Sequence, residues 1–274
     1  RRPSLGSVAR PVRSKPAAMT VDPEHVEVST ADHVATVRLC RPPNNFFSVA
    51  MIEALATSLE LLDADGTTRA VVLAANGKHF CAGADFSDSG RTDTTADLYR
   101  AAVRLFRTAT PIVAAVQGAA IGGGLGLALA ADFRIAAPEA RFSANFARLG
   151  FHHGFGLSVT LPALVGQQRA AELLYTGRRI DGAEAAAIGL VDRTVPLGDL
   201  DAIAHALAAE IAESAPLAVR SIRATLRGDL AERVAAATRH EMVEQERLRR
   251  TPDFKEGTRA MAERRSPTFT GAES

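Results

Sequence analysis

The chain has 274 residues and a formal net charge of +1, with 47% hydrophobic and 23% charged side chains, which is typical of a globular protein with a sizeable core. Near-neutral charge, the absence of tryptophan and an aromatic content of 5% argue against nucleic acid or an anionic membrane surface as partner. No apolar run is long enough to span a membrane, and Cys40 and Cys81 are too far apart to indicate a disulfide framework, so we expect a cytoplasmic protein.

The first residues differ from the rest of the chain. Residues 1–18 carry five basic side chains and no acidic one, together with prolines and serines, and they lack the apolar segment of a signal peptide. A basic tail, a transit-like segment and a natural start at Met19 are all open. Because such a composition cannot bury a core, we expect residues 1–20 to form a disordered basic tail.

Beyond this tail the sequence alternates strand and helix patterns. Apolar and polar residues alternate over 26–28 and 34–39, around an Asp-containing turn, which predicts a β-hairpin. Apolar residues have helical spacing over 49–62, and residues 70–73 form a short apolar strand that ends before an Asn-Gly turn signal.

The middle of the chain continues this alternation, and no strand pattern appears after about Val195. We therefore expect an α/β core over residues 21–200 and a helical C-terminal region over residues 201–274. The predicted segments are a helix through 99–106, a strand at 112–116, a helix that begins at the glycine run 122–124 and ends at 131, a strand at 133–136, and short helices at 161–164 and 169–175.

Two glycine-containing loops each follow a predicted strand, at residues 80–85 and 118–126. Glycines allow sharp turns and a close approach of a ligand to backbone N–H groups. The N–H groups of the second loop also lie at a helix N-terminus, where the dipole favours negative charge. Two such groups, one from each loop, could hold an oxyanion. Alone, the glycines would more often serve packing and turns, and the absence of a Gly-Lys-Ser/Thr ending excludes a phosphate loop.

The order of several motifs makes a family resemblance specific. The chain resembles the enoyl-CoA hydratase/isomerase (crotonase) family over roughly residues 26–269. The motifs that carry the resemblance are Phe-Cys-Ala-Gly-Ala-Asp at 80–85, Thr-Pro-Ile-Val-Ala-Ala-Val-Gln-Gly at 110–118, Gly-Gly-Gly at 122–124, Asp-Phe-Arg-Ile-Ala at 132–136, Thr-Gly-Arg-Arg-Ile at 176–180, Ala-Ile-Gly-Leu-Val at 187–191 and Glu-Arg-Arg-Ser-Pro-Thr-Phe at 263–269.

This resemblance implies a crotonase-like (ClpP/crotonase) ββα superhelix with a C-terminal helical trimerisation region, assembled as a homotrimer or a dimer of trimers. It implies an acyl-CoA or enoyl-CoA thioester as substrate, with coenzyme A as part of the substrate and with no separate cofactor or metal. The backbone N–H groups of Ala82 and Gly123 are expected to form the oxyanion hole. Ala84 and Asp85 are expected beside the CoA moiety, and Arg264 near the CoA of a neighbouring subunit.

The sequence departs from the family at both glutamates that its hydratases use. The place of the first, after the glycine run, is Gly126, and the place of the second is Phe146. Adding water across a double bond needs one group to activate water and another to manage the α-proton, and losing one acid–base group typically costs ~10²–10⁴-fold in rate. Ordinary hydratase activity is therefore disfavoured.

Other side chains near the predicted acyl pocket could move protons instead. His152 and His153 lie on a stretch that borders this pocket in the family, and histidine is suited to proton transfer near neutral pH. Packing of the two rings in a loop is an equally good interpretation. Asn145, Phe146 and Arg148 are expected to contact the acyl group.

Three other acidic or basic residues are expected to have no part in the chemistry. Asp132 lies between a helix and a strand and is more typical of a turn than of a catalytic acid. His240 and Glu241 are expected on the surface or in a subunit contact of a charged helix.

Three functions are open from the sequence. The first is an acyl-CoA enzyme that stabilises an enolate or oxyanion, as in isomerisation of a double bond or hydrolysis. The second is a non-catalytic acyl-CoA binding or carrier protein. The third is a true enoyl-CoA hydratase that uses other acid–base groups.

Overall fold

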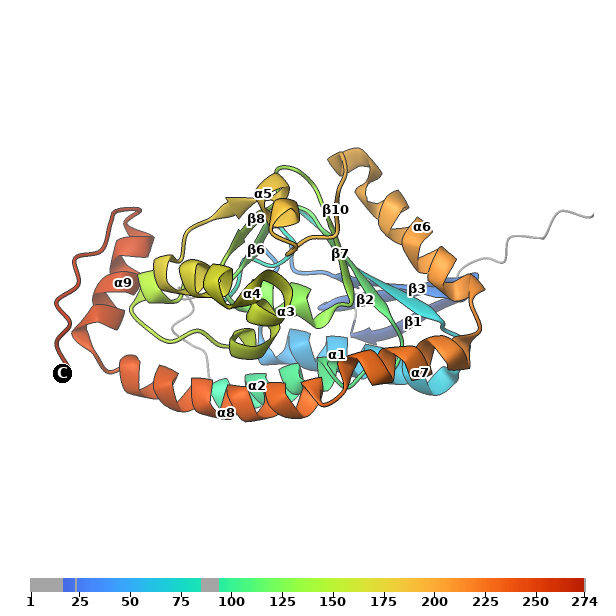
Figure 1. The fold of residues 1–274 in the computed structure, drawn as a ribbon, viewed down its shortest axis with the longest axis horizontal. Helices are drawn as coiled ribbons and strands as arrows, with labels where there is room; N and C mark the ends of the chain where they lie inside the picture. The colour runs from blue at the N-terminus through green and yellow to red at the C-terminus, as the bar shows by residue number, and fades with distance from the viewer. Residues whose placement is uncertain (1–16, 23, 85–93, 274) are drawn as a thin grey trace, which may run out of the picture.

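The structure is a computed structural model that describes residues 17–22, 24–84 and 94–273. Its centre is a pair of β-sheets (Figure 1). The larger sheet has antiparallel pairing between its first three strands and parallel pairing between the others. Its strands, in spatial order, are β1 (Ala17–Asp22), β2 (Val26–Ala31), β3 (Val34–Leu39), β4 (Ala70–Ala75), β5 (Ile112–Val116), β7 (Phe133–Ala136) and β10 (Arg193–Thr194). The smaller sheet consists of β6 (Ala119–Ile121), β8 (Arg141–Ser143) and β9 (Ile180–Asp181).

From β5 to β8, successive strands alternate between the two sheets. Strand β5 of the larger sheet leads to β6 of the smaller one and then to a helix, and β7 leads to β8 and then to a 3₁₀ turn (Ala147–Leu149) and a long helix. This strand–strand–helix succession confirms the predicted α/β fold. The helices are α1 (Val49–Asp65), α2 (Thr95–Leu105), α3 (Gly123–Ala130), α4 (Leu157–Thr176), α5 (Gly182–Ala187), α6 (Leu200–Glu213), α7 (Pro216–Arg227), α8 (Leu230–Leu248) and α9 (Pro252–Ala262).

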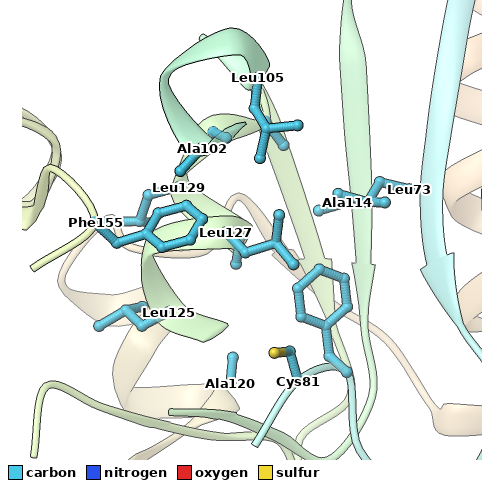
Figure 2. Close-up of a cluster of buried hydrophobic side chains, with 14 of the residues drawn as sticks. Leu73, Cys81, Ala102, Leu105, Ala114, Ala120, Leu125, Leu127, Leu129 and Phe155 are labelled. Atoms are coloured by element: carbon cyan, nitrogen blue, oxygen red, sulfur yellow. The ribbon is translucent and has the colours of Figure 1, made fainter. Parts of the chain in front are cut away.

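The central parallel strands β4 and β5 of the larger sheet are buried on both faces, as expected for parallel strands. Along β4, Leu73 belongs to the main core, which includes residues of α1, α2 and α3, whereas Val72 packs on the opposite face against α6. Figure 2 shows the main core, in which Leu127 of α3 lies near Leu105 of α2. The glycine-started helix α3 is therefore enclosed by the core, and this fixes the position of its N-terminus.

The structure confirms most predicted segments and corrects others. The hairpin, the helix over 49–62, the strands over 112–116 and 133–136 and the glycine-started helix are all present. The predicted disordered tail 1–20 is wrong at its end, because residues 17–20 pair with β2; residues 1–16 lie outside the described part. The two short helices expected at 161–164 and 169–175 lie in the two halves of α4, which are separated at Gly166 by a non-helical backbone conformation (φ 78°, ψ 159°). The short strands β6, β8 and β9 were not predicted.

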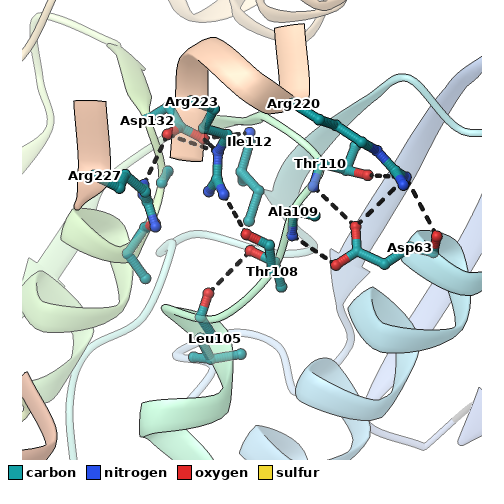
Figure 3. Close-up of polar contacts among 12 residues, drawn as sticks. Asp63, Leu105, Thr108, Ala109, Thr110, Ile112, Asp132, Arg220, Arg223 and Arg227 are labelled. Atoms are coloured by element: carbon teal, nitrogen blue, oxygen red, sulfur yellow. Dashed lines mark hydrogen bonds and ion pairs between the residues drawn. The ribbon is translucent and has the colours of Figure 1, made fainter. Parts of the chain in front are cut away.

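Asp132 anchors the C-terminal helix α7 to the core (Figure 3). Nε of Arg223 donates to both carboxylate oxygens of Asp132, at 3.0 and 2.9 Å, and Nε of Arg227 donates to one of them at 3.0 Å. The same carboxylate accepts the N–H of Ile112 at 2.8 Å. Asp132 therefore has a structural role, as expected from the sequence.

In the part of the chain that the structure describes, no single helix has both the length and the hydropathy to cross a membrane. The pair formed by residues 197–213 and 216–227, bent by 108°, meets the criteria only when its two helices are taken together.

Candidate functional site

The two glycine-containing loops lie side by side. The N–H of Cys81 donates to the carbonyl of Ala119 at 2.9 Å, and the N–H of Ile121 donates to the carbonyl of Cys81 at 3.1 Å. The approach is so close that a Cβ at Gly83, where φ is 92°, would lie 2.7 Å from the carbonyl oxygen of Ile121. A Cβ at Gly124 would overlap the carbonyl of Cys81. Glycine is thus required at these positions for the loops to meet.

Some backbone N–H groups of these loops already donate a hydrogen bond within the protein, whereas others have no acceptor among the described residues. Contrary to the prediction, the N–H of Ala82 is occupied, because it donates to the carbonyl of Asn44 at 2.9 Å. The N–H of Ala84 has no acceptor among the described residues, while the neighbouring carbonyl of Gly83 accepts from Phe47. Gly123 is the first residue of α3, so its N–H has no partner within the helix. Ala84 and Gly123 therefore present the N–H groups that can receive an oxyanion.

A pocket of about 880 Å³ opens at this junction. Among the predicted site residues, Ala82, Ala84, Gly123, Asn145, Phe146 and Arg264 line it. None of the described lining residues is an aspartate, glutamate or histidine. The charged side chains of the lining are three arginines: Arg249, Arg259 and Arg264.

Aromatic rings occupy the space of both missing glutamates. Gly126 is buried in α3, and a Cβ there would lie 2.6 Å from Cβ of Phe155 and 2.8 Å from its ring. Phe155 is 1% exposed and has a φ of 62°, a strained value for a residue with a side chain. Phe146 is also buried and lines the pocket. The positions that carry the hydratase carboxylates thus form an apolar wall.

The histidine pair does not line the pocket, so its expected acid–base role is not supported by the geometry. The rings of His152 and His153 stack with centroids 4.1 Å apart, and their loop packs against α8. Nε2 of His153 lies 2.8 Å from the hydroxyl of Ser158. Burial, with smaller effects from His152 and His240, lowers the pKa of His153 to about 4. The imidazole of His153 is therefore neutral at pH 7.

Glu241, expected on the surface or in a subunit contact, is fully buried within its own chain. Its carboxylate accepts the N–H of Gly156 at 2.9 Å, and the N–H and hydroxyl of Ser158 at 3.1 and 2.6 Å. It therefore caps the N-terminus of α4 from a helix more than 80 positions later in the sequence. This carboxylate holds the loop that carries Phe155, and Glu241 is not itself among the residues that line the pocket.

The remaining predicted residues have separate positions. Nε of Arg148 donates to the carbonyl of Thr176 at 2.7 Å, and Arg148 is exposed and does not line the pocket, so it does not contact an acyl group there. Asn145 lines the pocket beside Gly122. Arg264 lies at the pocket of its own chain, whereas the sequence interpretation placed it at a neighbouring subunit's CoA. Asp85 lies outside the described residues.

Sequence reasoning missed a polar pair in the lining, Tyr99 and Gln245. The hydroxyl of Tyr99 donates to Oε1 of Gln245 at 3.1 Å, and Nε2 of Gln245 donates to the carbonyl of His152 at 2.9 Å. Burial raises the pKa of Tyr99, so the phenol is neutral. The helical patterns of α2 and α8 contain these residues, but only the tertiary fold brings the two helices together.

Comparison with known proteins agrees with this architecture. The model of the enoyl-CoA hydratase/isomerase family matches residues 29–272. The chain belongs to the enoyl-CoA hydratase/isomerase family. It is 38% identical over 247 residues to a protein of Thermus thermophilus named as a candidate enoyl-CoA hydratase, covering 86% of this chain and 97% of that protein. It is 34% identical over 210 residues to an enoyl-CoA isomerase/hydratase of Mycosarcoma maydis, covering 74% and 77% of the two chains.

A solved structure of an enoyl-CoA hydratase/isomerase from Pseudoalteromonas atlantica superposes with a TM-score of 0.83, at 35% identity, over 89% of this chain and 99% of that one. Within the enoyl-CoA hydratase/isomerase family, the present chain therefore combines the family fold with a pocket lining whose described residues carry no carboxylate.

Proposed function

We propose that the protein binds an acyl-CoA thioester and holds its carbonyl oxygen between the N–H groups of Ala84 and Gly123. The observation that carries this proposal is the pair of N–H groups without acceptors among the described residues, on two abutting loops at the wall of one pocket. N–H groups fixed in this way stabilise an enolate or tetrahedral oxyanion without reorganisation during the reaction. The positive end of the α3 dipole adds to this stabilisation.

The charge of the pocket supports a polyanionic ligand. Arg249, Arg259 and Arg264 line it, and Arg259 is also paired with Glu256 at 2.5 Å. Guanidinium groups bind phosphate oxygens well. Coenzyme A carries several phosphate oxygens, so its thioesters match both the arginines and the oxyanion hole.

For the reaction, we propose stabilisation of a thioester enolate or oxyanion, as in double-bond isomerisation or hydrolysis. Classical hydration is disfavoured because Phe155 covers Gly126 and Phe146 occupies the second position. The alternative is a non-catalytic acyl-CoA binding protein, and the lack of carboxylate and imidazole in the described lining favours it. Assembly as a trimer or dimer of trimers and a cytoplasmic location stay predictions.

Product analysis separates these functions. The purified protein is incubated with a panel of acyl- and enoyl-CoA esters, and the products are analysed by liquid chromatography with mass detection. A shifted retention at constant mass or the release of free CoA would support the isomerase-like or hydrolase-like function. Gain of water would contradict the argument from the missing glutamates. Binding without change would favour the binding protein, and an absence of binding would overturn the proposal.

The proposed oxyanion hole is tested by a substitution at Ala84. A bulky residue at Gly123 would collide with the ring of Phe47, so its effect could come from repacking alone. The Ala84→Pro substitution removes one N–H that makes no bond to a described residue. We expect acyl-CoA binding at least tenfold weaker in Ala84→Pro, with Ala84→Ser, which keeps the N–H, as the matched control. Equal affinity of the two variants would sink the assignment of Ala84.

A further inference from the structure

Phenylalanine rings flank the proposed carbonyl site itself. A Cβ at Gly122 would lie 3.6 Å from Cζ of Phe146, and a Cβ at Gly123 would overlap the ring of Phe47. One turn further along α3, Gly126 packs against Phe155 in the same way. An acyl group that starts at the N–H of Gly123 must therefore extend along these rings.

The rings belong to a larger aromatic wall. Among the residues that the structure describes, five phenylalanines line the pocket: Phe46, Phe47, Phe146, Phe151 and Phe155. Phe47 and Phe155 have ring centroids 6.1 Å apart and are tilted by 55°, and Phe146 meets Phe151 edge to face at 5.4 Å. These are the geometries in which aromatic rings attract one another, and a further planar ring beside them would gain the same contacts.

A polar group interrupts this wall at Tyr99 and Gln245. Because Nε2 of Gln245 is committed to the carbonyl of His152, its Oε1 faces Tyr99 and the phenol is the donor. Gly154 is needed here, since a Cβ at this position would overlap the hydroxyl of Tyr99. The hydrogen of this neutral phenol is committed to Gln245, so towards a ligand the phenol oxygen acts as a hydrogen-bond acceptor.

We propose that the acyl subsite takes an aromatic acyl group that bears a hydroxyl or another hydrogen-bonding substituent, with its ring against the phenylalanine wall and its substituent at Tyr99. This inference rests on the proposed function. Tyr99 then determines which acyl groups the pocket binds most tightly. A ligand that lacks the substituent forgoes a hydrogen bond to the phenol oxygen, whereas a straight aliphatic chain lacks the ring contacts.

The test measures dissociation constants, by calorimetry, for benzoyl-CoA, 3- and 4-hydroxybenzoyl-CoA, cyclohexanecarbonyl-CoA and hexanoyl-CoA. For the wild type, we expect the better of the two hydroxybenzoyl esters to bind about tenfold more tightly than benzoyl-CoA, and benzoyl-CoA more tightly than the cyclohexane ester. In Tyr99→Phe, which keeps the ring, the ratio between the hydroxybenzoyl and benzoyl esters should fall to about one. Tyr175→Phe is the matched control, because Tyr175 is the other tyrosine of the chain and is 80% exposed.

The outcomes separate the two proposals. If hexanoyl-CoA binds most tightly, or if the hydroxyl preference is unchanged in Tyr99→Phe, the aromatic subsite is wrong although acyl-CoA binding stands. If no ester binds to the wild type, the proposed function fails as well. A lost preference in Tyr99→Phe together with a retained one in Tyr175→Phe supports the inference, and equal loss in both variants contradicts it.

Discussion

Position 126 shows how a single glycine determines the character of the pocket wall. A side chain there would have to share space with Phe155, whose own backbone is held in a strained conformation. The assignment of Gly126 to the place of a hydratase glutamate rests on the sequence resemblance alone, because it depends only on which residue follows the glycine run. The ring that fills the space beside Gly126 could not be predicted from the sequence. Phe155 comes from a loop 29 positions later and reaches α3 only in the tertiary fold.

Replacing Gly126 by alanine tests this packing. Alanine in place of a helical glycine normally stabilises a protein. Here the added Cβ collides with Phe155, so we expect a loss of ~1–3 kcal/mol in the free energy of unfolding. The measurement is urea denaturation, with Gly198→Ala as the control because a Cβ at Gly198 meets nothing within 4 Å. A stabilised Gly126→Ala variant would show that Phe155 does not fill this space.

His153 predicts a pH dependence of stability. Its pKa is lowered in the folded state to about 4 from the ordinary histidine value of 6.5, mainly by burial. The unfolded state therefore binds a proton first, and the contribution of His153 to stability, present above pH 6.5, is lost as the pH falls from about 6.5 to about 4.

Between these two pH values, the contribution of His153 to the free energy of unfolding should change by about 2–3 kcal/mol, and this change is removed in His153→Gln. Thermal melts of the wild type and His153→Gln measure this difference over roughly pH 7.5 to 4.5. This range runs from above the unfolded-state pKa of His153 towards its folded-state pKa. His205→Gln on α6 serves as the control for loss of an imidazole elsewhere. Parallel melting curves for wild type and His153→Gln over this range would contradict the account.

At the scale of elements, the helices and strands follow from local patterns, but the contacts that position them do not. Hydrophobic spacing predicted α1, α3 and, in the larger sheet, the strands β2, β3, β4, β5 and β7, because each has a strong apolar period or run. The strands of the smaller sheet have two or three residues each, too few to show a period. The cap that Glu241 places on α4 joins segments distant in sequence, so no local signal could reveal it.

The carboxylate of Glu241 is expected to hold the loop that carries Phe155. The substitution Glu241→Ala leaves the N–H of Gly156 and the N–H of Ser158 without their acceptor, which should cost ~1–3 kcal/mol and speed the exchange of these two amides. Amide hydrogen exchange measures the effect. Glu244→Ala is the control on the same helix, since Glu244 makes only an ion pair with the exposed Arg247. Unchanged exchange in Glu241→Ala would exclude the capping role.

At the scale of the whole molecule, the C-terminal helices complete the pocket of their own chain. Helices α8 and α9 supply lining residues, among them Gln245 and Arg259, and α7 is fixed to the core through Asp132. The sequence predicted a helical C-terminal region but assigned Arg264 to a neighbouring subunit. Where the C-terminal helices pack on the core depends on contacts such as those of Asp132. In the sequence, the residues that make such contacts appear only as isolated charges.

Asp132→Ala is predicted to loosen this attachment. It leaves the guanidinium groups of Arg223 and Arg227 buried without their carboxylate, which should cost ~3–5 kcal/mol. Denaturation and limited proteolysis of α7 measure the change. Asp229→Ala is the control, because Asp229 pairs with Arg233 at the exposed surface and should contribute at most ~1 kcal/mol. A stability loss no larger than that of the control would show that the clamp does not hold α7.

The central claim, that a thioester carbonyl is held by the N–H groups of Ala84 and Gly123, is tested most directly by infrared spectroscopy. A substrate labelled with ¹³C at the thioester carbonyl is bound to the protein, and the difference spectrum isolates its C=O stretch. Two hydrogen bonds polarise the carbonyl, so the account predicts a shift to lower frequency in the wild type and a smaller shift in Ala84→Pro. A bound ester whose C=O stretch matches that in water, or is equally shifted in both proteins, would contradict it.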